Sequence, residues 1–320
     1  MRQLPRIDDP NVLVGAASAD DAGVYRLSRD RALVQTVDFF TPIVDDPFLY
    51  GQIAATNALS DVYAMGGRPL TALNIMGMPD DVVPPDVIAA ILRGGAKKAK
   101  QAGCAVLGGH TIRNPEPIYG MSITGMVSPR RMLTNARARP GDLLLLTKPL
   151  GTGIVTTGIK RGITSPALAR KAATLMCRLN SVGAEIAERG IVRAAVDVTG
   201  FGLLGHLASM CRASGVGAEL YPAKVPCLSA EVMRLIEKDC VPGGTRQNLQ
   251  AADEIVAWNQ TPMNLRLLLA DAQTSGGLLI CVPERHLPLA LEIMRRNRTL
   301  CAAVIGKIVR TNAPEIFMKM

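Results

Sequence analysis

The chain has few aromatic residues, no closely spaced cysteines and no long hydrophobic run. Aromatic residues make up 3% of its 320 residues, with a single Trp. The core must therefore consist of Leu, Val, Ile, Ala and Met. Because single-stranded nucleic acids are usually bound on aromatic stacking platforms, we expect no nucleic-acid partner. The net charge of +9 then points to a small anionic partner such as a phosphorylated molecule.

The missing cysteine pairs and apolar segments also exclude several classes of protein. The seven cysteines form no CxxC pair and no zinc-binding spacing, so we expect reduced thiols in a cytoplasmic protein. No apolar stretch approaches the roughly 18 residues of a membrane-spanning helix. The first ten residues, "MRQLPRIDDP", lack the apolar region of a signal peptide. We therefore expect no membrane partner.

Predicted strands and helices alternate along the whole chain, which indicates an α/β or α+β protein with two domains. Strands are expected at 32–40, 104–110 and 117–127 and near 217–221, 277–282 and 301–309, and the segment 142–151 is predicted as a strand that runs into a turn. Helices are expected at 47–67, 84–103 and 165–190 and near 229–238, 247–257 and 285–297, and the segment 194–215 is predicted as a strand, a loop and a helix. The Arg- and Pro-rich segment 128–141 is predicted as a linker between domains 1–127 and 142–320.

Two glycine motifs resemble nucleotide-binding loops. "GFGLLG" (200–205) follows a predicted strand and opens a helix, with Glu219 about twenty residues further on, as in a dinucleotide-binding fingerprint. An NAD-dependent oxidoreductase is therefore an alternative, but it leaves the acidic turns described next unexplained. "GIVTTGIK" (153–160) fails as a phosphate-binding loop, because Ile159 separates the second glycine from Lys160.

Carboxylates recur in small, apolar or glycine-rich surroundings at predicted element ends. They are Asp20, Asp21, Asp38, Asp61 and Asp197. Asn57 and Asp61 are spaced i, i+4 and share one face of a helix. "GGHT" (108–111) is predicted as a turn after a buried strand, and "TKPLGTG" (147–153) adds a lysine and another turn.

Oxygen ligands of this kind suit Mg²⁺, which usually binds carboxylates together with substrate phosphates. Glycine turns let backbone N–H groups approach phosphate oxygens. The set therefore predicts a metal–nucleotide site without a phosphate-binding loop of the common type. The alternative for any single Asp is that it caps a helix or closes a turn.

Several long segments resemble selenophosphate synthetase (selenide, water dikinase), a family of the aminoimidazole ribonucleotide synthetase-like superfamily. They are "DDAGVY", "TVDFFTPIVDDPFLYGQIAATNALSDVYAMGGRPL", "GGHTIRNPEPIYGMSITG", "LTKPLGTGI", "DVTGFGLLGHLASMC", "VPGGTRQN" and "DAQTSGGLL". The resemblance covers about residues 10–309.

This resemblance implies a two-domain fold, with a dimerising β-sheet in the N-terminal domain and a C-terminal α/β domain. It implies a homodimer that converts ATP, selenide and water to selenophosphate, AMP and phosphate. The implied magnesium ligands are Asp21, Asp61 and Asp197. The implied ATP contacts are Ser18, Ala19, Asp20, Asp38, Asp61, Gly109, His110 and Thr111, with Asn57 as a second contact on the Asp61 helix face.

The family normally carries an upstream glycine-rich segment with a reactive Cys or selenocysteine followed three residues later by Lys. In this sequence the first cysteine is Cys104, at the start of a predicted buried strand. No catalytic residue is therefore identified, and we expect a start site assigned too late. The chain as given is expected to bind Mg–ATP but to make selenophosphate poorly. A superfamily relative that phosphorylates another small substrate, and a catalytically inactive ATP-binding protein, remain alternatives.

Overall fold

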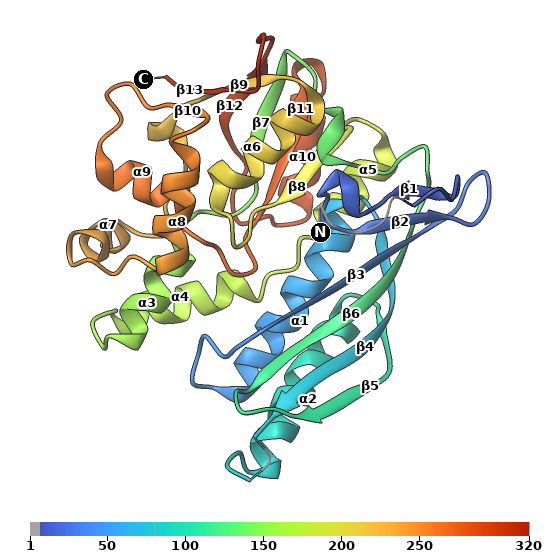
Figure 1. Ribbon diagram of the computed structural model, residues 1–320, viewed down its shortest axis with the longest axis vertical. Coiled ribbons are helices and arrows are strands. Elements are labelled where there is room, and N and C mark those ends of the chain that lie inside the picture. Colours follow the sequence, from blue (N-terminus) through green and yellow to red (C-terminus); the bar gives the residue numbers. More distant parts are fainter. Residues whose placement is uncertain (1–6, 80, 320) are drawn as a thin grey trace. The chain divides into compact units, whose positions relative to one another are not determined.

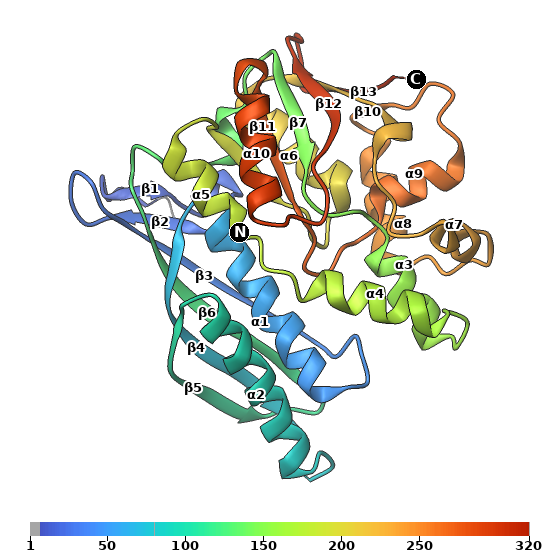
Figure 2. The same ribbon diagram turned by 180° about the vertical axis from the view of Figure 1, so that it is seen from behind.

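A computed structural model of the protein describes residues 7–79 and 81–319. Residues 1–6 of the expected first domain lie outside this range. Contacts divide the chain into two compact units. The first runs to Met132 and includes Met176–Ala184, and the second contains Leu133–Leu175 and Glu185–Met320. Each unit is built on its own mixed sheet, which confirms the predicted α/β class (Figures 1 and 2).

The first unit is a six-stranded sheet with two long helices. Its strands are β1 (Val12–Val14), β2 (Gly23–Arg26), β3 (Ala32–Phe40), β4 (Arg68–Met78), β5 (Ala105–Arg113) and β6 (Ile118–Val127). Their order is β1-β2-β3-β6-β4-β5, in which only β4 and β5 run parallel. The helices are α1 (Pro47–Ala64) and α2 (Pro85–Gln101), and both lie on the same face of the sheet (Figures 1 and 2).

Local sequence explains where α1 begins and how β3 is oriented. Asp46 precedes the helix and accepts a hydrogen bond from Leu49 N at 2.9 Å, while Pro47 occupies the first helical position, which needs no N–H donor. On β3, Val34 and Thr36 are buried whereas Gln35 and Val37 are exposed. Because side chains alternate along a strand, Thr36 and Asp38 share the face that packs on α1.

The second sheet has seven strands in the order β10-β13-β9-β12-β7-β11-β8. These are β7 (Asp142–Leu146), β8 (Ala194–Asp197), β9 (Gly217–Leu220), β10 (Val256–Ala257), β11 (Leu278–Pro283), β12 (Ala303–Val309) and β13 (Ile316–Met318). The helices of this half are α3 (Thr152–Lys160), α4 (Pro166–Met176), α5 (Val182–Arg189), α6 (Gly202–Ser214), α7 (Ala230–Glu237), α8 (Gly243–Ala252), α9 (Met263–Ala270) and α10 (Leu287–Arg296). The short 3₁₀ helices are η1 (Ala16–Ser18), η2 (Asn135–Arg137), η3 (Pro222–Lys224) and η4 (Glu284–His286).

The single helix expected at 165–190 is two helices, α4 and α5. Residues between them turn away and pack in the first unit, where Asn180 Nδ2 donates to Ser60 Oγ at 2.8 Å. Lys98 Nζ likewise donates to Cys177 O at 2.6 Å. The expected continuous domain 142–320 therefore differs from the contact-based division in two ways: the second unit begins at Leu133, and Met176–Ala184 belongs to the first unit. Strand β4 and helix α9 were not predicted.

The expectations for residues 104–110 and 128–141 are corrected as well. Strand β5 is an edge strand that is exposed along most of its length, and it continues through the predicted glycine turn. In the expected linker, Leu133 and Asn135 are buried, whereas its arginines are exposed. The Ser214 hydroxyl of α6 bridges it, accepting from Ala138 N and donating to Asn135 O.

Within residues 7–79 and 81–319, none of the helices has both the length and the apolar character needed to cross a membrane.

Candidate functional site

Strand β3 and helix α1 each contribute one carboxylate, Asp38 and Asp61, to the inner face of the first sheet. Thr36 Oγ1 donates to Asp61 Oδ2 at 2.5 Å. Asn57 Nδ2 donates to Asp38 Oδ2. Thr36 and Asp38 lie two residues apart on one face of β3, and Asn57 and Asp61 lie four residues apart on one face of α1. Because these two faces pack against each other, each strand residue meets one helix residue. We call Thr36, Asp38, Asn57 and Asp61 the β3–α1 cluster.

Thr36 and Asn57 of the β3–α1 cluster are buried, whereas Asp38 and Asp61 are half-buried. Thr36 is 8% exposed and Asn57 is 5% exposed. Burial raises the pKa of the Asp38 carboxyl, while hydrogen bonds from Phe39 N and Asn57 lower it in part. The predicted helix face of Asn57 and Asp61 is confirmed, whereas sequence reasoning missed Thr36. Its signal was the strand alternation that places it on the same face as Asp38.

Residues 18–21 enter strand β2 next to this cluster. Gly23 pairs with Gln35, so the chain before it runs beside the part of β3 that contains Thr36 and Asp38. Ser18 Oγ donates to Gly15 O at 2.7 Å, and Asp20 Oδ1 accepts from Asp21 N at 3.2 Å. Ala19 adopts a left-handed conformation with φ of 47°, which is unusual for a residue with a Cβ. The turn is thus held in one shape.

The predicted turn at Gly109–His110–Thr111 is wrong, because these residues form part of strand β5. They pair with Asn74, Ile75 and Met76 of β4. Gly109 has φ of 157° and lies so close to β4 that a Cβ would meet Asn74 O at 2.3 Å. His110 is exposed and is thus neither a turn residue nor a core imidazole. Strand β5 lies three places from β3, about 14 Å at usual strand spacing.

In the second unit, Asp197 ends strand β8 and is 2% exposed. Thr199 follows it in the turn into α6, and its backbone N–H donates to His206 Nε2 at 3.1 Å. Burial lowers the pKa of His206 to about 4, so the imidazole is neutral and can accept this bond. His206 was not predicted as a site residue, and it fixes the turn that carries Asp197.

The "GFGLLG" motif belongs to this turn and not to a dinucleotide site. Strand β8 pairs antiparallel with β11, and within the described chain it has no parallel neighbour. A dinucleotide fingerprint requires a parallel βαβ unit. The oxidoreductase alternative is therefore rejected on topology.

The "TKPLGTG" and "DAQTSGG" segments meet at the same strand ends. Lys148, 2% exposed, donates from Nζ to Ser275 O at 2.8 Å. Gly276 lies so close to Val198 that a Cβ would meet its carbonyl oxygen at 1.9 Å. This packing fixes Lys148 and the Asp197 turn in one block of the second unit.

Buried Asp271 accepts hydrogen bonds at the N-terminus of α3. Its carboxyl accepts hydrogen bonds from Gly153 N, Thr245 Oγ1 and Gln273 Nε2 at 2.8–3.1 Å. Burial raises the pKa of Asp271 to about 7 despite these donors. Asp271 was not predicted, and it is a structural residue that stabilises the helix N-terminus.

No group of three or more His, Cys, Asp or Glu side chains among residues 7–79 and 81–319 stands close enough to hold a metal ion. The magnesium ligands expected from the sequence thus remain a prediction. The candidate ligands are carboxylate oxygens, which are hard ligands. They belong to Asp38 and Asp61 in the first unit and to Asp197 in the second. Their chemistry fits Mg²⁺ and not a soft transition metal.

Two sequence profiles match the chain. Residues 19–127 match the N-terminal domain of AIR synthase related protein, and residues 139–319 match its C-terminal domain. Selenide, water dikinase of Myxococcus xanthus is 51% identical over 302 residues, which are 93% of this chain and 85% of that protein. Selenide, water dikinase of Carboxydothermus hydrogenoformans is 46% identical over 320 residues, 100% of this chain and 92% of that protein.

Solved structures share the fold at lower sequence identity. Thiamine-monophosphate kinase from Stenotrophomonas maltophilia superposes with a TM-score of 0.70 at 20% identity, covering 97% of this chain and 92% of that one. Hydrogenase maturation protein HypE, solved in complex with ATP, superposes with a TM-score of 0.66 at 21% identity, covering 95% and 83%. The profiles, the near-full-length relatives and the shared fold agree, and the chain belongs to the selenide, water dikinase family of AIR synthase related proteins.

Proposed function

We propose that this chain catalyses the ATP-dependent synthesis of selenophosphate from selenide, with AMP and phosphate as the other products. The observation that carries the proposal is the β3–α1 cluster, to which a strand and a helix each contribute one carboxylate. Family membership supports the choice of selenide as the acceptor. Phosphoryl transfer depends mainly on positioning and charge neutralisation, and ordered oxygen ligands supply both.

The proposal assigns magnesium to Asp21, Asp61 and Asp197, whose carboxylates are the hard ligands that this ion prefers. When bound, Mg²⁺ would neutralise phosphate charge. Thr36 holds Asp61 by its hydroxyl, so one carboxylate oxygen is oriented before any ligand arrives. Support from a neighbouring donor of this kind usually strengthens metal binding by 10- to 100-fold.

ATP is assigned to the turn at Ser18, Ala19 and Asp20 and to Asp38, Asn57 and Asp61. The left-handed Ala19 supports the first part of this assignment, because such a conformation turns successive N–H groups toward one side, where phosphate oxygens can bind. For Asp38, the Asn57 amide fixes the direction of the carboxylate. The assignment of Gly109, His110 and Thr111 rests on the family resemblance alone, because these residues lie on edge strand β5.

The decisive experiment is to replace Asp61 by Asn in the full chain and to measure magnesium-dependent ATP binding together with selenide-dependent AMP formation, because the chain as given is expected to bind Mg–ATP but to make selenophosphate poorly. We expect a loss of about 100-fold or more, because Asn keeps the shape but removes the charge that binds Mg²⁺. Asp86→Asn is the matched control, since Asp86 is an exposed carboxylate in the first turn of α2. It is expected to retain full activity.

Three results would contradict the proposal. Equal activity of Asp61→Asn and the unchanged chain would remove the cluster from the reaction. ATP turnover with another acceptor but not with selenide would favour a superfamily relative with a different substrate. Tight ATP binding without turnover on any acceptor would favour an inactive ATP-binding protein.

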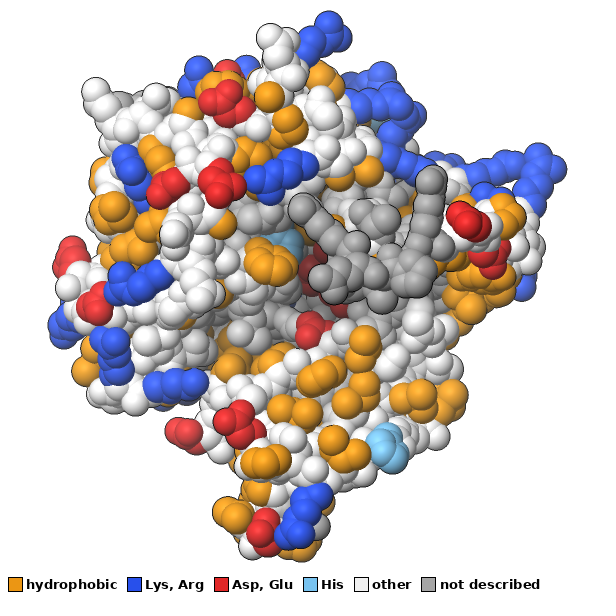
Figure 3. Space-filling view, in the orientation of Figure 1, with side chains coloured by type: hydrophobic (Ala, Val, Ile, Leu, Met, Phe, Trp, Pro, Cys, Tyr) orange, Lys and Arg blue, Asp and Glu red, His pale blue; other side chains and the backbone are white. Residues whose placement is uncertain are grey.

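We also propose that two copies associate through the outer face of the first sheet. This face carries exposed apolar side chains of three strands, among them Val37, Phe39, Leu73 and Ile112. Val37 and Leu73 flank Ser122 of β6 in one row across the sheet. Figure 3 shows hydrophobic side chains gathered over this sheet. An exposed apolar patch on a regular sheet supports self-association.

A cytoplasmic location is part of the same proposal. All seven cysteines are free thiols, and four of them are buried. Free thiols are typical of proteins in reducing compartments.

A further inference from the structure

Three arginines meet at one end of the second sheet because of the strand order. Strands β7, β11 and β8 are neighbours, and β11 runs antiparallel to both of the others. The start of β7, the end of β11 and the start of β8 therefore lie at the same edge. Arg139 precedes β7, Arg193 precedes β8, and Arg285 follows β11 in η4.

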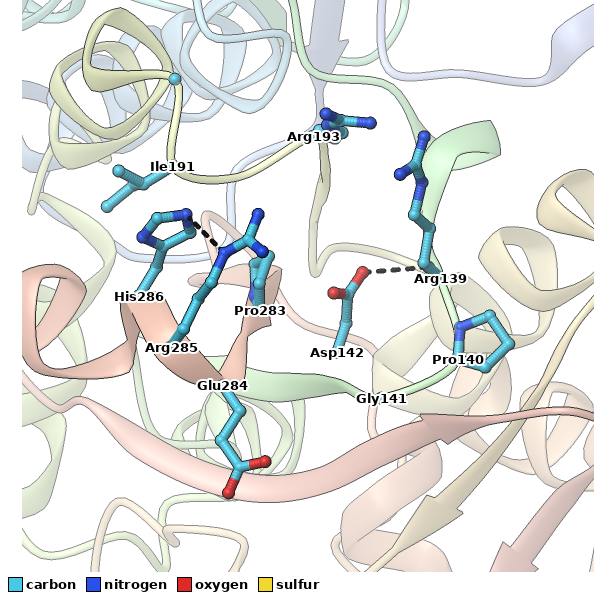
Figure 4. Close-up of a pocket in the computed structure, with 11 residues that line it drawn as sticks. Arg139, Pro140, Gly141, Asp142, Ile191, Arg193, Pro283, Glu284, Arg285 and His286 are labelled. Atoms are coloured by element: carbon cyan, nitrogen blue, oxygen red, sulfur yellow. Dashed lines mark hydrogen bonds between the residues drawn. The ribbon is translucent and has the colours of Figure 1, made fainter.

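These arginines line a hollow of about 460 Å³, a volume in the range of small-ligand sites. In Figure 4, Asp142 points to the same side as the guanidinium groups of Arg285 and Arg139, whereas Glu284 points away from them. Arg285 Nε donates to His286 Nε2 at 3.2 Å, and this bond orients its guanidinium group. At the base of the hollow, Asp142 Oδ2 accepts a hydrogen bond from the backbone N–H of Arg139 at 2.9 Å.

The residues that line the hollow include three arginines and two acidic residues, Asp142 and Glu284, so the lining keeps an excess of positive charge. Arg139, Arg193 and Arg285 appear in none of the ion pairs found between described residues. Of the lining residues drawn in Figure 4, Asp142 is the carboxylate on their side; it is 8% exposed, accepts a hydrogen bond from Arg139 N and attracts the Arg139 and Arg193 guanidinium groups, so it offsets part of their charge. Three guanidinium groups around one hollow repel each other, so an anion that bridges them is attracted.

This hollow is separate from the Asp197 end of the same strands. Asp197 pairs with Leu278 at the start of β11, whereas Asp142 pairs with Pro283 at its end. Five residues along a strand span roughly 17 Å. A ligand in the hollow is therefore not the nucleotide whose phosphate charge would be neutralised by the magnesium proposed at Asp197.

We infer that the hollow at Arg139, Arg193 and Arg285 is a second binding site, specific for a small molecule that carries a phosphate group. Arginine binds phosphate through two parallel N–H···O bonds, and three arginines, all exposed to solvent, line this hollow. The volume accommodates more than one phosphate group and is closed on its floor by the β7–β11 ladder. The inference does not depend on the proposed reaction.

The test is calorimetric titration of the full chain in magnesium-free buffer with inorganic phosphate, pyrophosphate or AMP. Comparing the three shows whether the site prefers a free phosphate, a diphosphate or a nucleotide. We expect saturable binding of at least one of them. The double variant Arg139→Gln/Arg285→Gln should weaken it by about tenfold or more, since each lost charge-assisted pair costs more than a neutral hydrogen bond. The single variants Arg193→Gln and Arg285→Gln should each give a smaller loss.

The double variant Arg161→Gln/Arg234→Gln is the matched control. It removes the same charge from exposed positions outside the hollow, and should bind as the unchanged chain does. Asp61→Asn should also retain the binding. The inference is overturned if none of the three ligands binds, if the control loses as much affinity as the pocket variant, or if Asp61→Asn abolishes binding. Binding of transfer RNA in place of all three small ligands would overturn it too.

Discussion

The turn after Asp197 depends on one neutral imidazole. His206 accepts the Thr199 N–H, and the exposed Phe201 ring packs against it with centroids 5.8 Å apart. Protonation of Nε2 would replace an acceptor by a donor and place a charge in a buried position. The folded protein therefore resists protonation at this site, whereas the unfolded chain does not.

This difference predicts a loss of stability in acid. The ordinary His pKa near 6.5 falls to about 4 at His206 on folding. The stabilisation is complete above pH 6.5 and is lost as the pH falls toward 4, by at most about 3 kcal/mol. Urea unfolding at a series of pH values should show this decrease. In His206→Gln the acid-induced decrease in unfolding free energy should be smaller by the contribution of His206, although the variant is expected to be less stable than the unchanged chain at neutral pH.

His110→Gln serves as the control, because it replaces an exposed imidazole. It should reproduce the pH dependence of the unchanged chain. If His206→Gln loses as much unfolding free energy in acid as the unchanged chain, the assignment to His206 is wrong.

At the scale of elements, two glycine positions set how closely α1 and α2 pack. A Cβ on Gly51 would lie 2.0 Å from Ile91 O, and one on Gly94 would lie 2.1 Å from Phe48 O. These backbones are in direct contact, so neither position can accept a side chain without separating the helices. The Gly94–Gly95 pair, which weakens the helix prediction for 84–103, is thus what allows α2 to pack here.

Gly94→Ala should lower the unfolding free energy by about 3 kcal/mol, because the added methyl group must push α2 away from α1. Thermal or urea unfolding measures this change. The β3–α1 cluster is expected to be disturbed as well, so selenide-dependent AMP formation should fall in parallel.

A matched substitution separates this packing effect from helix propensity. At Gly243, in the first turn of α8, an added Cβ meets no atom within 4 Å. Gly243→Ala should therefore change stability by no more than about 1 kcal/mol, and in the stabilising direction. Equal destabilisation by both substitutions would contradict the packing explanation.

At the scale of the whole molecule, the outer face of the first sheet predicts the oligomeric state. Leu73 is 48% exposed and Phe39 is 46% exposed. The molecular mass measured by sedimentation should be twice the mass of one chain, which is 34.0 kDa. Leu73→Asp should convert the protein to monomers, because a carboxylate in a dry apolar interface is left without solvation.

Ile163→Asp provides the comparison, since Ile163 is 41% exposed and belongs to the second unit, not to the first sheet. It should sediment as the unchanged chain does. A monomer at every concentration of the unchanged protein, or dissociation caused equally by both variants, would overturn the dimer proposal.

The sequence alone determined the features that depend on local periodicity. Strand β3, helix α1 and the strand–turn–helix at 194–215 follow from alternation, capping and glycine spacing, which act over a few residues. The position of Asn57 and Asp61 on one helix face has the same local origin. Sequence similarity added the family.

Tertiary structure decided what depends on partners far apart in the chain. Thr36 meets Asp61, and Lys148 meets Ser275, only through packing between elements. The turn predicted at Gly109 became an edge strand because β4, itself unpredicted, offers parallel hydrogen bonds. The arginine hollow arises from the order of β7, β11 and β8, because no local pattern fixes which strand ends become neighbours.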